Sequence, residues 1–245
     1  MASADAAGEL PHPGGRTAVI VPAAGRGERL GPGGPKALRP LAGVPMLVHA
    51  VRALASSRAV HLVVVAAPPD AIDTFSTLLG EHDFPADVTV VAGGDTRQDS
   101  VARALITLPD DIRTVLVHDA ARPLVPEQVV TRVVAAIGEG HQAVVPALPV
   151  VDTIKEIDDA GTVVRTVDRT SLQAIQTPQA FRRDVLQRAH AESDLSVTDD
   201  AGLVEAIGIP VFVVPGHEEA LKVTRPFDVV IAEAILARRR AAGAV

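Results

Sequence analysis

A loop of small residues near the start of the chain combines close backbone approach with two positive charges. It follows an apolar run and reads Ala23-Ala24-Gly25-Arg26-Gly27-Glu28-Arg29-Leu30, and Lys36 follows a further stretch of Gly and Pro. Small side chains let backbone N–H groups approach phosphate oxygens, and Arg29 and Lys36 can stabilise charge on a phosphoryl group in transfer. The pattern predicts a triphosphate site; a plain strand-to-helix turn with solvated cations is the alternative from this segment alone.

Two common glycine-rich phosphate motifs do not fit this loop. A dinucleotide-binding fingerprint requires glycine three positions after Gly27, where the chain has Leu30. A P-loop requires Gly-Lys followed by Ser or Thr, whereas the chain has Pro35-Lys36-Ala37. If the loop binds phosphate, it therefore does so as neither of these motifs.

One carboxylate directly follows a later apolar run. Asp119 comes two residues after Val117, so the end of a strand would place its carboxylate at the rim of a sheet, where Mg²⁺ is commonly held beside phosphates. Asp at the end of a strand also serves often as a turn residue, and both readings fit the residue type.

A second glycine-rich segment, Gly93–Ser100, offers groups that could recognise a nucleobase. Gly94 permits close backbone approach, and Asp95 and Ser100 supply hydrogen-bonding groups. By residue type alone, a turn residue is the commoner role for Asp95, and a residue at the start of a helix is the commoner role for Ser100.

Taken in order, these segments and several later ones resemble the nucleotidyltransferases that make nucleoside-diphospho sugars and alditols. Within that group the chain most resembles the 2-C-methyl-D-erythritol 4-phosphate cytidylyltransferase (IspD) family of the non-mevalonate isoprenoid pathway. The resemblance runs from about Thr17 to Ala237. Beyond the first loop, the blocks that carry it are Gly93–Ser100, Val117–Pro123, Asp152–Lys155, Gln176–Gln179, Thr198–Asp200 and Lys222–Thr224.

The resemblance implies transfer of a cytidylyl group from CTP to 2-C-methyl-D-erythritol 4-phosphate, which gives 4-diphosphocytidyl-2-C-methyl-D-erythritol and pyrophosphate. It implies that Arg29 and Lys36 are catalytic and that Asp119 binds Mg²⁺ or another divalent cation. The implied nucleotide-binding residues are Ala23, Ala24, Gly25, Gly94, Asp95 and Ser100. The implied substrate-binding residues are Arg122, Thr153, Arg169, Thr177 and Lys222.

For some of these positions, an exposed residue without a role in binding is the alternative. In addition, the chain departs from the family pattern at two places that concern the choice of acceptor. Single exposed Thr and Arg residues are commonly only solvated, and Lys222 could be an edge-strand lysine. Many family members have Gln and an aromatic residue where this chain has Ala37-Leu38, and Asn where it has Ala220. Another alditol phosphate, such as ribitol 5-phosphate, is therefore an alternative acceptor.

A nucleotide-binding regulator without catalysis is the alternative from a different class of protein. Loss of a catalytic cation or of the metal ligand would be its expected sign. Arg29, Lys36 and Asp119 are all present, and their presence argues against it.

Composition excludes several other classes of function. The 245 residues are 47% hydrophobic, which suffices for a substantial core, and no run approaches the roughly 18 apolar residues that span a bilayer. The net charge of −7 and the absence of Trp and Tyr argue against nucleic-acid binding. The absence of Cys excludes disulfides and thiolate metal sites. We expect a cytoplasmic protein without membrane or nucleic-acid partners.

Short β-branched runs alternate with amphipathic stretches, which predicts an α/β fold. It would be a Rossmann-like three-layer sandwich with a mostly parallel sheet. The predicted strands are Thr17–Val21, His61–Ala66, Val88–Val91, Thr114–Val117, Ala143–Val145 and Val211–Val214. The predicted helices are Met46–Ala55, Asp70–Leu79, Gln98–Leu108, Glu127–Ile137, Arg183–Ala191, Ala201–Ile207 and Phe227–Arg240. Ligands of such sheets bind beyond the carboxyl ends of the strands, so the loops after the strands should converge there.

The alternation is interrupted by a hairpin pattern, in which two short β-branched runs flank Asp158–Gly161. We expect residues 1–15 to form a flexible extension and residues 16–245 a single domain, with a β-arm inserted at about 150–173. An isolated hairpin is only marginally stable, so the arm should pack on a second copy in a homodimer. Thr153 and Arg169, with Arg122 near the junction, would then complete the partner's pocket. A β-meander on the chain's own domain is the alternative.

Overall fold

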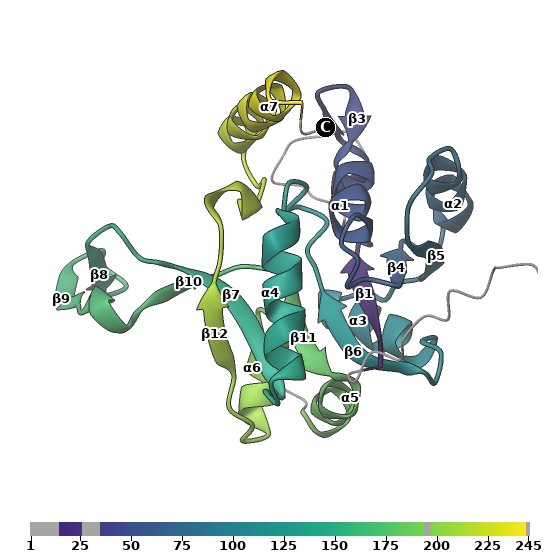
Figure 1. The fold of residues 1–245 in the computed structure, drawn as a ribbon. Coiled ribbons are helices and arrows are strands. Elements are labelled where there is room, and N and C mark those ends of the chain that lie inside the picture. Colours follow the sequence, from purple (N-terminus) through teal and green to yellow (C-terminus); the bar gives the residue numbers. More distant parts are fainter. Residues whose placement is uncertain (1–14, 26–34, 194–196, 244–245) are drawn as a thin grey trace, which may run out of the picture.

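The computed structural model describes residues 15–25, 35–193 and 197–243. Its centre is an eight-stranded sheet (Figure 1) with strand order β10-β7-β11-β6-β1-β4-β5, and β12 pairs with β7. The strands are β1 (Arg16–Pro22), β4 (Leu62–Ala67), β5 (Asp87–Ala92), β6 (Ile112–Val117), β7 (Ala143–Pro149), β10 (Gln173–Ile175), β11 (Gln179–Arg182) and β12 (Phe212–Pro215). The pairs β1–β4, β1–β6, β4–β5 and β7–β12 are parallel.

Helices cover both faces of the sheet, which explains why the central strands are apolar throughout. In β1, Val19 and Val21 pack into one core and Ala18 and Ile20 into the other, and all four are fully buried. The first core contains residues of α1 (Met46–Ala55), α2 (Ile72–Gly80) and α4 (Glu127–Gly138). The second contains residues of α3 (Arg97–Ile106), α5 (Arg183–Glu192) and α6 (Asp200–Ala206). The predicted fold class is confirmed.

The sequence patterns did not predict β10 and β11. β11 lies between β6 and β7 and is antiparallel to both, and β10 is antiparallel to β7. Both segments contain Gln and lack a β-branched run. They become strands because the neighbouring strands present N–H and C=O groups that must be paired when buried. β10 and β11 introduce antiparallel pairs beside β6 and β7, and the sheet as a whole remains mostly parallel.

The predicted hairpin forms as β8 (Ile154–Ile157) and β9 (Val163–Val167), which pair as a separate antiparallel two-stranded sheet. This arm projects from the body of the molecule, at the left of Figure 1. It is not a meander folded against its own domain. Large apolar side chains on and before its strands are exposed, among them Val151, Ile157 and Val164.

A small layer above the sheet connects two segments that bear predicted site residues. It comprises β2 (Pro40–Leu41), β3 (Val44–Pro45) and α7 (Pro226–Ala241). The short helices η2 (Lys36–Leu38) and η4 (Glu218–Ala220) precede β2 and α7 in the chain, and each buries one alanine in the first core. Leu41 of β2, Leu236 of α7 and Val223 share one buried cluster. The segments that begin at Lys36 and at Lys222 are therefore packed together.

Of the expected extension at 1–15, residues 1–14 lie outside the described part of the structure. Among the described residues, no helix is both long enough and apolar enough to cross a bilayer.

Candidate active site

A small pocket lies beyond the carboxyl ends of β1 and β6, with a volume of about 110 Å³. It is lined by Pro22, Ala23, Gly25, Lys36, Ala37, Arg97, Asp119, Ala120, Ala121 and Lys222. Predicted residues from three distant segments therefore meet at the edge of the sheet where ligands of such folds bind.

Arg29 falls in residues 26–34, which lie outside the described residues. Gly25 and Lys36 flank that segment in sequence, and both line the pocket. Each end of the predicted phosphate loop thus reaches the pocket.

The carboxylate of Asp119 is surrounded by three cations. The Nζ atom of Lys222 lies 2.8 Å from Oδ2, the Nε atom of Arg97 lies 3.4 Å from Oδ1, and the Nε atom of Arg122 lies 3.7 Å from Oδ2. The side chain is only 12% exposed. Burial alone would raise the pKa of Asp119, but Arg97, Lys222 and Arg122 outweigh it and hold that pKa well below its usual range. Asp119 is therefore a fixed negative charge in a positive pocket.

The backbone beneath Asp119 is held by a chain of hydrogen bonds. The Asp119 N–H donates to Thr177 Oγ1 at 3.1 Å, and Thr177 Oγ1 lies 3.1 Å from His118 Nδ1. His118 Nε2 lies 3.0 Å from the Arg122 carbonyl. Burial lowers the pKa of His118 to about 4, so the ring is neutral: Nε2–H donates to the carbonyl and Nδ1 accepts from the Thr177 hydroxyl. Thr177, predicted to bind substrate, is buried here beneath the pocket.

Arg122 connects the turn after β6 to two later segments. Its Nη1 donates to the Ala220 carbonyl at 2.7 Å, and Nη2 donates to the Ile175 carbonyl at 3.2 Å. Ala220, one of the departures from the family pattern, is fully buried. Arg122 therefore anchors the segment that leads to Lys222.

The Gly93–Ser100 segment packs beside the first loop. A Cβ atom at Gly93 would lie 2.9 Å from Ala24 Cβ, so only glycine permits this approach. The Ser100 hydroxyl accepts from the Gly94 N–H at 3.0 Å and donates to the Thr96 carbonyl at 2.9 Å. Ser100 is therefore buried and shapes the loop, whereas Asp95 is exposed.

Sequence reasoning missed Arg97. It is the first residue of α3, after the N-cap Thr96, and it lines the pocket beside Asp119. An Arg at the start of a helix is ordinary by itself, and its pairing with Asp119 arises only from the tertiary fold. Its place inside the Gly93–Ser100 block was the one signal that could have singled it out.

Thr153 and Arg169 belong to the arm region and do not line the pocket of their own chain. Thr153 precedes β8 and is exposed. Arg169 begins η3 (Arg169–Ser171) after β9, where its Nη1 donates to the Val151 carbonyl. A single chain therefore does not bring these two residues to Asp119.

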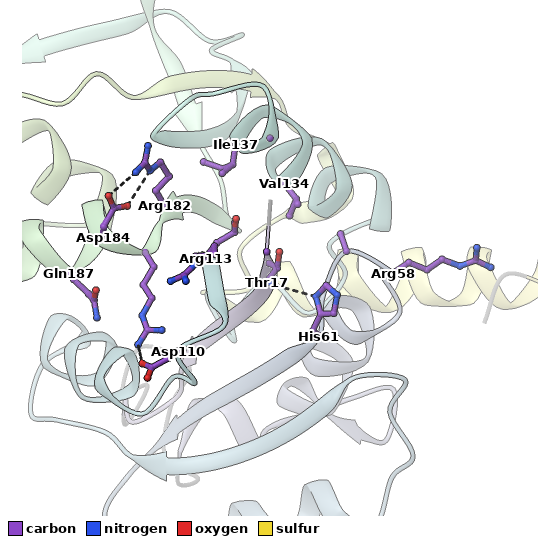
Figure 2. Close-up of a pocket in the computed structure, with 15 residues that line it drawn as sticks. Thr17, Arg58, His61, Asp110, Arg113, Val134, Ile137, Arg182, Asp184 and Gln187 are labelled. Atoms are coloured by element: carbon purple, nitrogen blue, oxygen red, sulfur yellow. Dashed lines mark hydrogen bonds and ion pairs between the residues drawn. The ribbon is translucent and has the colours of Figure 1, made fainter. Parts of the chain in front are cut away.

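A much larger pocket, of about 1110 Å³, lies at the opposite, amino ends of the strands. Several of its polar and charged groups make structural contacts (Figure 2): Arg182 pairs with Asp184, and the Thr17 N–H donates to His61 Nδ1. Arg183 donates to the carbonyls of Leu108 and Pro109. This pocket contains none of the predicted site residues, so size alone does not indicate the active site.

Comparisons with known proteins show the family of this chain. The family model of 2-C-methyl-D-erythritol 4-phosphate cytidylyltransferase (IspD) matches residues 17–238. A protein of that name from Frankia casuarinae is 59% identical over 229 residues, which cover 94% of this chain and 84% of that protein.

Two solved structures are also similar. The 2-C-methyl-D-erythritol 4-phosphate cytidylyltransferase of Thermus thermophilus has a TM-score of 0.74 and 38% identity, covering 91% of this chain and 99% of the other. The 4-diphosphocytidyl-2C-methyl-D-erythritol synthase of Anaerococcus prevotii has a TM-score of 0.80 and 28% identity, covering 92% and 97%. With its fold, its pocket and these similarities, the chain belongs to the 2-C-methyl-D-erythritol 4-phosphate cytidylyltransferase family.

Proposed function

We propose that this chain transfers the cytidylyl group of CTP to 2-C-methyl-D-erythritol 4-phosphate. A phosphate oxygen of the acceptor attacks the α-phosphorus of CTP, the bond to the β-phosphate oxygen breaks, and pyrophosphate leaves. The observation that supports this proposal most directly is the pocket in which Lys36, Arg97 and Lys222 meet beside Asp119. Membership of the family supports the choice of both substrates.

The positive groups of the pocket suit this reaction. A phosphate monoester is already a nucleophile near neutral pH, so the protein needs to align the reactants and to stabilise negative charge. Lys36 and Arg97 line the pocket on different segments and can contact separate phosphate oxygens. Arg29 is proposed as a second catalytic cation from its charge in the small-residue loop and from the family resemblance. No covalent intermediate with the protein is required.

The residues around Asp119 fit a divalent cation that is shared with the nucleotide. Among the described residues, no cluster of three or more His, Cys, Asp or Glu could hold a metal by itself. Mg²⁺ commonly binds through one or two carboxylates together with substrate phosphates, and Asp119 supplies one partly exposed carboxylate at the pocket. The bound ion would neutralise charge that develops on the phosphates. Lys222 and Arg97 contact the two oxygens of Asp119, so a bound ion would compete with them for the carboxylate.

We propose that the acceptor pocket is completed in a homodimer through the arm. Thr153 and Arg169 do not line the pocket of their own chain, and the two-stranded arm exposes apolar side chains. Packing of the arm on a second copy would bury these side chains and bring Thr153 and Arg169 to that copy's pocket. The cytoplasmic location and the absence of nucleic-acid and membrane partners stay predictions from the sequence.

Pyrophosphate release tests the proposed function. The purified protein is assayed with CTP and Mg²⁺, and with either 2-C-methyl-D-erythritol 4-phosphate or ribitol 5-phosphate. We expect turnover with the first acceptor and little with the second. A clear preference for ribitol 5-phosphate would overturn the acceptor. CTP binding without pyrophosphate release for any alditol phosphate would instead indicate the non-catalytic regulator.

A further inference from the structure

Asp200 has a buried carboxylate with no role in the reaction proposed above. It is 1% exposed and lies in the first turn of α6. Its Oδ2 accepts from Arg97 Nη1 at 2.6 Å, and its Oδ1 lies 3.1 Å from His190 Nε2. The cap of α6 is supplied by the preceding residue, Asp199, whose side chain accepts from the Gly202 N–H at 3.1 Å. Asp200 is therefore not needed to cap the helix.

The position of Asp200 is fixed by hydrogen bonds between its two neighbours in the chain and a strand of the sheet. Gln179 of β11 donates from Nε2 to Asp199 Oδ2 at 2.7 Å and accepts at Oε1 from the Ala201 N–H at 3.1 Å. Gln179 is 1% exposed. Because both neighbours of Asp200 in the chain are bonded to one buried side chain, its carboxylate is a rigid anchor.

Arg97 is shared between two carboxylates at unequal distances. Its Nη1 lies 2.6 Å from Asp200, and its Nε lies 3.4 Å from Asp119. Among the described residues, only these two nitrogens of Arg97 make hydrogen bonds. The side chain is 30% exposed and lines the pocket, so a further N–H can reach a ligand there.

We propose that Asp200, braced by His190, is a positioning residue that holds Arg97 at the wall of the pocket, where Arg97 donates to a phosphate oxygen of the nucleotide. Without Asp200, the remaining carboxylate partner of Arg97 is Asp119. The guanidinium would then move fully onto the carboxylate that is proposed to bind the metal. Asp200 thus directs Arg97 toward the nucleotide and leaves Asp119 available. This inference rests on the proposed function, because it requires a nucleotide in this pocket.

A double-mutant cycle with calorimetric titration of CTP in the presence of Mg²⁺ tests the inference. The proteins are the wild type, Asp200→Asn, Arg97→Gln and the double variant. We expect about tenfold weaker CTP binding for each single variant, the scale of one lost hydrogen bond between charged groups. The double variant should bind CTP no more weakly than Arg97→Gln alone, because Asp200 acts through Arg97. Losses that multiply in the double variant would overturn the inference.

Control variants separate positioning from stability. Asp184 also lies in the first turn of a helix and pairs with an arginine, Arg182, but it is not part of the proposed active-site pocket. Asp184→Asn should therefore leave CTP binding unchanged. If Asp200→Asn does not fold, His190→Gln and His190→Ala replace it: glutamine keeps an N–H donor and should retain binding, whereas alanine should weaken it about threefold. Equal binding by both His190 variants would then contradict the inference.

The same titration distinguishes failure of the proposed function from failure of the positioning role of Asp200. A wild type that binds no CTP with Mg²⁺ would overturn the proposed function and, with it, the role of Asp200. A wild type that binds CTP while Asp200→Asn binds equally well would overturn the positioning role alone.

Discussion

The ammonium group of Lys222 lies 2.8 Å from the carboxylate of Asp119, although the two residues are far apart in the sequence. Asp119 follows β6, and Lys222 follows η4, just before the residue that packs against α7. Arg122 fixes their relative position through its bond to the Ala220 carbonyl. Lys222 is nearly half exposed, so it can leave Asp119 for an incoming phosphate.

We predict that Lys222→Met impairs the acceptor step more than nucleotide binding. The apparent KM for the alditol phosphate should rise about tenfold or more, because one charged contact with its phosphate is lost. The dissociation constant for CTP, measured by calorimetry, should change much less. Lys222→Arg keeps the charge and should recover part of the loss. A larger effect on CTP binding than on the acceptor would contradict the assignment.

The substitution Lys36→Ala should lower turnover far more than it weakens CTP affinity. The charge of Lys36 matters most as negative charge builds up on the transferred phosphoryl group, so we expect kcat to fall by roughly 10²-fold or more. Steady-state kinetics and CTP titration together measure both quantities. Equal losses in turnover and in affinity would show that Lys36 acts in binding alone, and Lys36→Arg serves as the charge-retaining control.

The substitution Gly94→Ala should disturb the nucleotide loop. A Cβ atom there would lie 2.2 Å from Asp99 Cβ, so the loop must shift. We expect CTP binding to weaken by about tenfold, as contacts of the loop are lost. Gly138→Ala is the matched control, because no atom lies within 4 Å of the added carbon at that position. Unchanged CTP affinity in Gly94→Ala would separate this loop from the nucleotide site.

The stability of the protein should fall as pH decreases below about 6.5, partly because of His118. Burial lowers its pKa from 6.5 to about 4, so the unfolded state binds a proton before the folded state does. The stabilising contribution is complete above pH 6.5 and is lost as pH falls toward 4; the shift corresponds to about 3 kcal/mol. Urea unfolding without nucleotide or divalent cations, at pH 7, 6, 5 and 4, measures this slope. His118→Gln should flatten it, and equal slopes in both proteins would refute the assignment.

The dimer proposal predicts that a charge on the arm disrupts assembly and activity together. Val164 of β9 is 59% exposed, and Val164→Asp should convert dimers to monomers and reduce turnover. Ile106→Asp is the control, since Ile106 on α3 is 82% exposed and lies outside the arm. Light scattering coupled to size-exclusion chromatography measures the mass. A monomeric wild type with full activity would remove the arm from the mechanism.

The sequence by itself determined the class of fold and predicted five of the ten residues that line the pocket. Apolar β-branched runs alternate with amphipathic stretches, and this pattern predicted a mostly parallel sheet covered on both faces, with its loops at one edge. Ala23, Lys36 and Asp119 could be placed there because they lie in or at the end of segments that follow predicted strands. The arm could be predicted because its turn residues stand between two short β-branched runs.

Only the tertiary structure decided which charges meet and which residues lie beneath them. The pairing of Arg97 with Asp119 and Asp200 joins three segments that are far apart in the chain, and no local periodicity reports such a contact. Likewise β11 forms because β6 and β7 leave backbone groups to be paired, although its own residues do not favour a strand. Local patterns specify elements, whereas the distances between side chains depend on how those elements pack.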